Sequence, residues 1–90
     1  MAFAKRDLSV LAYANGFTLW HYTTPDPHTG VRVSGYFNAA ESMLRVGDMI
    51  LANTGTAGAS PAAGILLVNA NAAGVVDVAD LTPVGATDTD

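Results

Sequence analysis

The chain has no cysteine among its 90 residues, which excludes disulfide bonds, thiolate nucleophiles and zinc sites built on thiolates. A domain of this size buries only about 60–65% of the surface that its unfolded chain exposes, so its core is small. Half of the residues are hydrophobic, but 16 of them are alanine. With no disulfide available, association with a partner is the remaining source of stability that small domains commonly use.

Positive charge is also scarce, because Lys5, Arg6, Arg32 and Arg45 stand against eight acidic residues. The formal net charge of −4 argues against a general affinity for nucleic acid, which needs clustered Lys and Arg. All four cations lie in the first half of the chain, whereas the second half carries five aspartates and no cation. The partners expected from this charge distribution do not include nucleic acid.

Long hydrophobic runs are absent as well. No segment approaches the roughly 20 consecutive apolar residues that span a bilayer. The apolar residues after Lys5 and Arg6 are interrupted by Asp7 and Ser9, and this run is too short for the core of a signal peptide. We therefore expect no membrane partner.

Between Asp48 and Asp77 the chain runs for 28 residues without a formal charge. A solvated surface of that length normally carries charge. Two interpretations remain open at this point. The stretch is either a turn-rich region that is simply neutral, or a face that packs on another protein.

The remaining composition favours short strands. Residues 17–24 are rich in aromatic and β-branched side chains and end at Pro25, which predicts a strand. Alternation along this strand divides its large side chains between two faces. We expect both faces to be covered, because one carries Phe17, Leu19 and His21 and the other carries Thr18, Trp20 and Tyr22.

The next segments predict a loop, a strand and a helix in turn. Residues 25–30 hold two prolines, an aspartate and a glycine, a composition typical of loops. Residues 31–34 alternate apolar and polar side chains and predict a half-exposed strand. Asn38, with Glu41 three residues later, predicts the capping box of a short helix over 39–44.

Further strands are expected over residues 49–53, 65–69 and 75–81, the last two joined as a hairpin in which Gly74 supplies a positive φ. The predicted fold class is mainly β, either a small β-barrel or a β-sandwich, with one short helix. Residues 1–84 form one domain that includes an extended N-terminal arm over 1–14. The polar, acidic residues 85–90 are expected to be disordered.

Catalytic and metal-binding patterns were sought among the few residues that carry such chemistry. The two histidines, His21 and His28, lie in the aromatic strand and in the proline-rich loop. Their spacing from Asp26 matches no standard metal-ligand pattern, and no serine occupies a nucleophile-elbow motif. The glycine-rich residues 55–60 lack the Gly-Lys-Ser/Thr ending of a phosphate loop. We therefore predict no catalytic residue, no cofactor and no metal, and a protein that is not an enzyme.

Aromatic and other large apolar side chains supply much of the energy of protein–protein contacts. In so small a domain each of them belongs either to the core or to an interface. The candidate interface residues are Phe3, Leu8, Phe17, Trp20, Tyr22, Tyr36 and Phe37.

Four segments resemble a group of small structural proteins of tailed bacteriophages and prophages. The segments are residues 15–24, 34–38, 43–48 and 76–81, and the resemblance covers roughly residues 10–82. Its most distinctive parts are the aromatic strand and the block Ser-Gly-Tyr-Phe-Asn over 34–38. No functional residue of that family is carried over to this chain.

The resemblance implies a capsid decoration (cement) protein that binds the outside of the capsid and stabilises the shell. The implied partners are the major capsid protein and further copies of this chain, most often as a trimer, and the implied location is the exterior of a virion assembled in the bacterial cytoplasm. Two alternatives remain. One is a head-spike base or a tail-associated structural protein, and the other is a small ligand-binding module that uses His21, His28 and Asp26.

Overall fold

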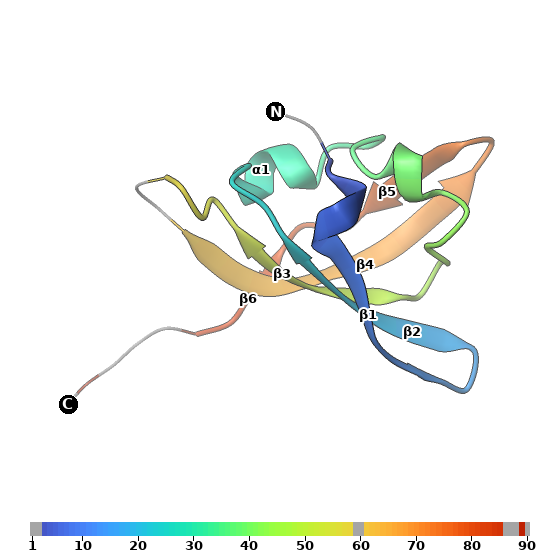
Figure 1. Cartoon of the computed structure of the whole chain (residues 1–90), viewed down its shortest axis with the longest axis horizontal. Helices are drawn as coiled ribbons and strands as arrows, with labels where there is room; N and C mark the ends of the chain where they lie inside the picture. The colour runs from blue at the N-terminus through green and yellow to red at the C-terminus, as the bar shows by residue number, and fades with distance from the viewer. Residues whose placement is uncertain (1–2, 59–60, 86–88, 90) are drawn as a thin grey trace.

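A computed structural model describes residues 3–58, 61–85 and 89. It confirms a mainly β domain with a single short α-helix in the described part of the chain. The sequence did not decide between a barrel and a sandwich, and the described strands form a single six-stranded sheet. The strand order is β1-β2-β3-β4-β5, with β6 paired to β4 (Figure 1).

The elements follow one another in a simple order along the chain. The strands are β1 (Leu8–Ala14), β2 (Phe17–Thr23), β3 (Met49–Thr54), β4 (Ala62–Ala72), β5 (Val75–Val78) and β6 (Thr82–Pro83). The helical segments are the 3₁₀ turn η1 (Lys5–Asp7), the helix α1 (His28–Val31) and the 3₁₀ turn η2 (Asn38–Ala40). The strands predicted over 17–24 and 49–53 and the hairpin predicted from 65 onward are confirmed.

Two tight turns set the register of the antiparallel pairs. Asn15 and Gly16, with φ of 55° and 88°, join β1 to β2, and Ala73 and Gly74, with φ of 55° and 81°, join β4 to β5. Two central residues with positive φ match the right-handed twist of a hairpin. The turn at Gly74 was predicted from the sequence.

Strands β2 and β3 are parallel neighbours, so the chain has to cross over from the end of one to the start of the other. The crossover, residues 24–48, carries α1 and η2, which lie on the same side of the sheet in Figure 1. Three of its apolar side chains, Val31, Phe37 and Leu44, are buried. The crossover thereby covers one face of the sheet.

Three predictions for this crossover were wrong. Residues 28–30, predicted as part of a loop, form the first residues of α1. The strand predicted over 31–34 is absent, because Val31 ends α1 and the following residues form turns. Pro27 is the N-cap of α1 and has an extended backbone, with φ of −68° and ψ of 154°. Its carbonyl oxygen accepts the first hydrogen bonds of the helix, from Gly30 N at 2.9 Å and from Val31 N at 3.1 Å. The helix predicted over 39–44 shrinks to η2, and Asn38 does not cap it. The Asn38 side chain instead accepts a hydrogen bond of 2.8 Å from Val76 N, which ties the crossover to β5.

The core lies between the crossover and the covered face of the sheet. Its strand residues come from the inward positions of β1 to β5, and the largest fully buried side chains include Tyr22, Ile50, Leu66, Val68 and Val76. The alternation predicted for β2 is confirmed, since Trp20 and Tyr22 are buried and Phe17 is exposed. Val76 and Val78 are likewise buried on either side of Asp77, which is half-buried.

The N-terminal segment, expected as an extended arm, packs on the chain's own core. The ring of Phe3 stacks on Tyr22 with 5.3 Å between ring centroids and meets Phe37 edge-on at 5.3 Å. Ala4 N donates a 3.1 Å hydrogen bond to Tyr22 Oη. Strand β1 then pairs with β2. Most of the C-terminal segment predicted to be disordered lies outside the described residues.

Candidate functional site

Among the described residues no crossover packs against the second face of the sheet, and the side chains of this face are largely apolar. Strand alternation and register place there the residues that point away from the core. We name this surface the open face. It consists of Ser9, Ala12, Ala14, Phe17, Leu19, His21, Thr23, Met49, Leu51, Asn53, Ala63, Ile65 and Leu67.

The register aligns these side chains in rows across β2, β3 and β4. One row joins Leu19, Met49 and Leu67, and the next joins His21, Leu51 and Ile65. Met49 is 47% exposed and Leu67 is 44% exposed. Directly opposed side chains on neighbouring strands contact one another, so the rows form a continuous apolar strip rather than scattered exposed residues.

Electrostatically the open face is empty of formal charge. None of its thirteen residues is Asp, Glu, Lys or Arg. The described charged residues lie elsewhere, for example Arg32 and Asp80, whose side chains approach to 3.7 Å in an exposed ion pair. On the open face the polar link is a 3.1 Å hydrogen bond between Asn53 Nδ2 and His21 Nε2. A face exposed to water normally alternates apolar-in with polar-out, so this one has the composition of a contact surface.

Phe17 and Gly47 shape the end of the open face nearest the β1–β2 turn. Gly47 has φ of 97°, and a Cβ built on it would lie 2.6 Å from Cε1 of the Phe17 ring. The glycine therefore allows the ring to lie against the backbone. A shallow hollow of about 170 Å³ lies beside the ring, lined also by Ala12, Leu19 and Met49.

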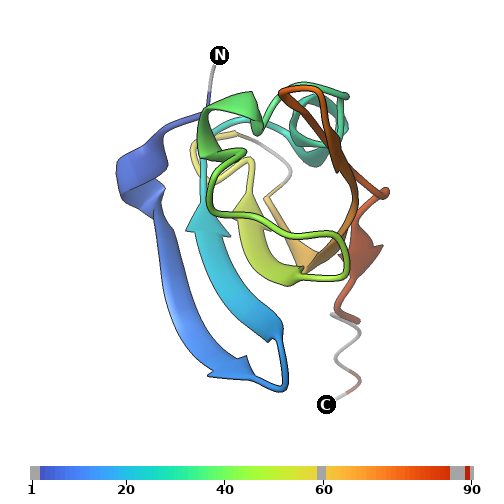
Figure 2. The ribbon, with the colours of Figure 1, turned by 90° about the vertical axis from the view of Figure 1, so that its right-hand side faces the viewer.

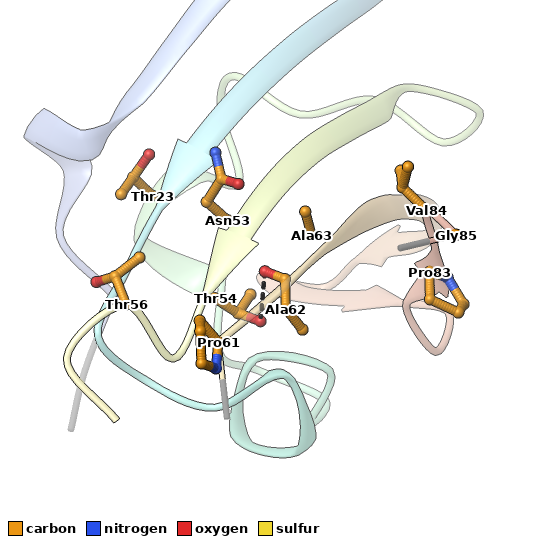
Figure 3. A pocket seen from close by; sticks show the side chains of 10 residues that line it. All are labelled: Thr23, Asn53, Thr54, Thr56, Pro61, Ala62, Ala63, Pro83, Val84 and Gly85. Carbon is orange, nitrogen blue, oxygen red and sulfur yellow. Dashed lines mark hydrogen bonds between the residues drawn. The ribbon is translucent and has the colours of Figure 1, made fainter. Parts of the chain in front are cut away.

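A larger hollow of about 640 Å³ adjoins the other end of the open face (Figure 3). Thr23, Asn53, Thr54 and Thr56 contribute hydroxyl and amide groups, and the remaining lining residues are small or apolar. None of the described residues that line it is ionisable. The lining can therefore form hydrogen bonds with a bound group and also pack against apolar atoms. The hollow extends the open face.

Most of the interface candidates predicted from the sequence are not available at the surface. Leu8, Trp20, Tyr22 and Phe37 are buried in the core of the chain. Phe3 and Tyr36 are half-buried and pack against that core. Phe17, at 57% exposed, is the candidate that lies on the open face.

The covered side holds a polar network around Tyr36. Its hydroxyl donates a 2.7 Å hydrogen bond to Asp26 Oδ2 and lies 2.9 Å from Tyr22 Oη. Thr24 Oγ1 accepts from Asp26 N at 3.0 Å, and Asp26 Oδ1 is buried with no partner among the described residues. Burial raises the pKa of Tyr36 above its usual range, and hydrogen bonds to Tyr22 and Asp26 add to that rise. This network fixes the N-terminal segment and the crossover on the sheet.

A second buried carboxylate, Asp48, organises the start of β3. It accepts hydrogen bonds from Thr18 N at 3.0 Å, from Trp20 Nε1 at 3.1 Å and from Arg45 N at 3.1 Å. The side chain is fully buried. Carboxylates that accept several N–H bonds hold their donors in fixed positions, so Asp48 joins the crossover to β2. Its role is structural.

The ligand-binding alternative needed His21, His28 and Asp26 to come together. His21 bonds Asn53 on the open face, whereas Asp26 bonds Tyr36 on the covered side. Among the described residues no group of three His, Cys, Asp or Glu side chains is arranged to hold a metal ion. The structure does not assemble that site.

Sequence reasoning missed most of the open face. Met49, Leu51, Ile65 and Leu67 read as the core of buried strands, because their apolar neighbours occupy every position. The signal that pointed to them was the 28-residue neutral stretch, which contains all four. The exposed side chains of β1, Val10, Leu11 and Tyr13, gave no comparable signal.

Comparisons with protein families, with curated proteins and with solved structures found no match to this chain. In the described part of the chain no helix is long and apolar enough to cross a membrane. The open face, with the two hollows at its ends, is the candidate functional site.

Proposed function

We propose that the chain is a structural virion protein of a tailed bacteriophage, binding the outside of the capsid as a decoration protein that stabilises the shell. The observation that carries this proposal is the open face, an apolar sheet surface without formal charge. The resemblance of residues 10–82 to small phage structural proteins supplies the class of partner. The major capsid protein is that partner.

The open face suits a repeated contact with a protein lattice. Burying apolar area contributes about 25 cal/mol per Å² removed from water, and a neutral face carries no charge that would have to be desolvated. A decoration protein that binds the assembled shell better than free capsomers shifts the equilibrium toward the shell. Many copies, or linked copies, achieve this with modest contacts.

Co-sedimentation tests the proposal directly. Heads assembled without this protein, from the phage or prophage whose genome encodes the chain, are mixed with purified protein and pelleted. The proposal requires the protein to enter the pellet at micromolar concentration and to saturate at a fixed number of copies per head. Protein that remains in the supernatant at every concentration contradicts it.

The alternative within the same class is a head-spike base or a tail-associated protein. Images of particles carrying labelled protein separate the two. Label over all facets supports decoration, and label confined to vertices or to the tail supports the alternative.

A further inference from the structure

Strand β1 has a bare edge. It forms one end of the sheet, and within residues 3–58 and 61–85 no strand pairs with its second edge. Such an edge presents unpaired backbone N–H and C=O groups to any extended chain. Natural sheets commonly guard it with lysine or proline, and residues 8–14 contain neither these nor any charge.

The other edges of the sheet are protected. On β5, Val76 O accepts a 2.9 Å hydrogen bond from Gly35 N, and Val76 N donates to Asn38 Oδ1. The crossover thus occupies the edge of β5. Strand β6 is two residues long and contains Pro83, which has no N–H to donate. The edge of β1 is the one left for pairing among these three strands.

The side chains of the β1–β2 hairpin also remain uncovered. Figure 2 shows this hairpin extending beyond the rest of the sheet. Ten large hydrophobic residues are exposed in the described structure, and four of them belong to this hairpin: Val10, Leu11, Tyr13 and Phe17. A strand added to the edge would therefore bury apolar side chains together with backbone groups.

The geometry of the turn shows which backbone groups point outward. Because the loop has two residues, Ala14 and Phe17 form the hydrogen-bonded pair that closes it. The next pair, Tyr13 and Thr18, is then a non-hydrogen-bonded pair. Thr18 N accordingly turns away from β1 and donates to Asp48 Oδ1 at 3.0 Å. By the same alternation the N–H and C=O of Tyr13 point to the bare edge. The register shift in β1 lies between Val10 and Ala12. Residues 12–14, next to the turn, pair with β2 in regular register.

We propose that a second copy of this chain pairs its own β1 with the bare edge of β1, antiparallel and about a two-fold axis. A second copy offers the same single free edge, so an edge-to-edge contact between copies has to be isologous. Each molecule carries a net charge of −4, and a neutral strand lets two such molecules meet without opposing like charges. Pairing also joins the two open faces into one larger surface.

This contact makes the unit a dimer, which departs from the trimer that the resemblance implies. It does not rest on the proposed capsid function, because its argument comes from the sheet edges alone. Antiparallel order places the charged residues 5–7 of one copy near the turn at Asn15 and Gly16 of the other, so these charges do not oppose one another.

Sedimentation equilibrium with a matched pair of variants tests the contact. The wild-type chain is expected to have the mass of two copies at micromolar concentration. Tyr13→Pro removes the outward N–H and leaves the hydrogen bonds to β2 intact, as proline is tolerated on edge strands; it should raise the dimer dissociation constant at least tenfold. Tyr13→Val keeps the N–H and a strand-forming side chain, and it should remain dimeric.

Amide hydrogen exchange gives a second readout that needs no variant. The Tyr13 amide should exchange slowly in concentrated protein and faster on dilution, whereas the Ala14 amide, bonded to β2, should change far less. A monomer at all concentrations, a trimer, or a Tyr13 amide that exchanges equally fast at every concentration overturns the proposal. A dimer that ignores undecorated heads would overturn the capsid function alone, and a monomer that binds heads would overturn the dimer alone.

Discussion

The two faces of the sheet are built from the same strands and the same kinds of side chain, yet the described part of the chain covers only one of them. Leu66 is fully buried beneath the crossover, and its neighbour Leu67 is 44% exposed on the open face. The crossover closes one face because the parallel β2–β3 pair requires a long connection. Within residues 3–58 and 61–85 no such connection crosses the other face. Stability is therefore concentrated on one side of the sheet, and the capacity to bind on the other.

The largest expected effect separates the two faces by one residue. Leu66→Ala should reduce the free energy of unfolding by about 2–5 kcal/mol, because it leaves a cavity in the core. Leu67→Ala removes the same atoms from an exposed side chain and should cost less than about 1 kcal/mol. Urea unfolding followed by circular dichroism measures both. Equal losses would show that the open face is covered within the single chain.

Removal of the Asp48 carboxylate should rank second. Asp48→Ala removes the acceptor of three hydrogen bonds, one of which is the buried bond from Trp20 Nε1, and should cost about 2–4 kcal/mol. Asp77→Ala, at a half-buried acid on β5, serves as the control and should cost less than about 1 kcal/mol. Urea unfolding measures the free energy of unfolding of the two variants. A loss of less than about 1 kcal/mol in Asp48→Ala would contradict the structural role of Asp48.

A glycine pair measures how closely Phe17 lies against the backbone. Gly16 and Gly47 both have positive φ, but a Cβ at Gly16 meets nothing within 4 Å. Gly16→Ala should cost about 1 kcal/mol for the backbone conformation alone. Gly47→Ala adds the conflict with the ring and should cost about 1–2 kcal/mol more. Thermal unfolding measures the loss of stability in the two variants. Equal losses would contradict the close contact between Gly47 and the Phe17 ring.

The smallest effect on stability is expected from pH. The pKa of Tyr36 is raised in the folded chain, whereas the pKa of a tyrosine in an unfolded chain is about 10. The contribution of Tyr36 is thus fully present below about pH 10 and is lost as the pH rises above it, since only the unfolded state then releases the proton. Tyr36→Phe should be less stable at neutral pH, because Asp26 loses its donor, but should lose less stability between pH 9 and 11. An unchanged slope would contradict this account.

The strands could be predicted from the sequence where side-chain alternation and turn chemistry agreed. Phe17 to Thr24 and the turn at Gly74 are examples in which local preference and tertiary structure coincide. The crossover could not be predicted. Val31 and Val33 alternate with polar residues as in a strand, but the crossover between β2 and β3 has to cover one face of the sheet. The Asn38 side chain accepts a hydrogen bond from β5 instead of capping a helix.

The candidate surface was only indirectly predictable. The aromatic residues chosen as interface candidates, such as Trp20 and Phe37, fill the core because a small domain needs its largest side chains there. The open face is built from aliphatic residues that a sequence cannot assign to one face or the other when both faces of a strand are apolar. The lack of charge over 28 residues was the one sequence feature that marked it.

The central claim is that the open face contacts the partner, and a charge-insertion experiment tests it most directly. The double variant Met49→Glu/Leu67→Glu places two carboxylates in one row of the open face. Val33→Glu/Val46→Glu is the matched control, because these side chains are also exposed, at 57% and 55%, but lie on the crossover. Both variants should unfold within about 1 kcal/mol of the wild type. In co-sedimentation with undecorated heads, the open-face variant should bind at least about tenfold more weakly, a loss of roughly 1.4 kcal/mol, and the control should bind like the wild type. Undiminished binding of the open-face variant would contradict the claim.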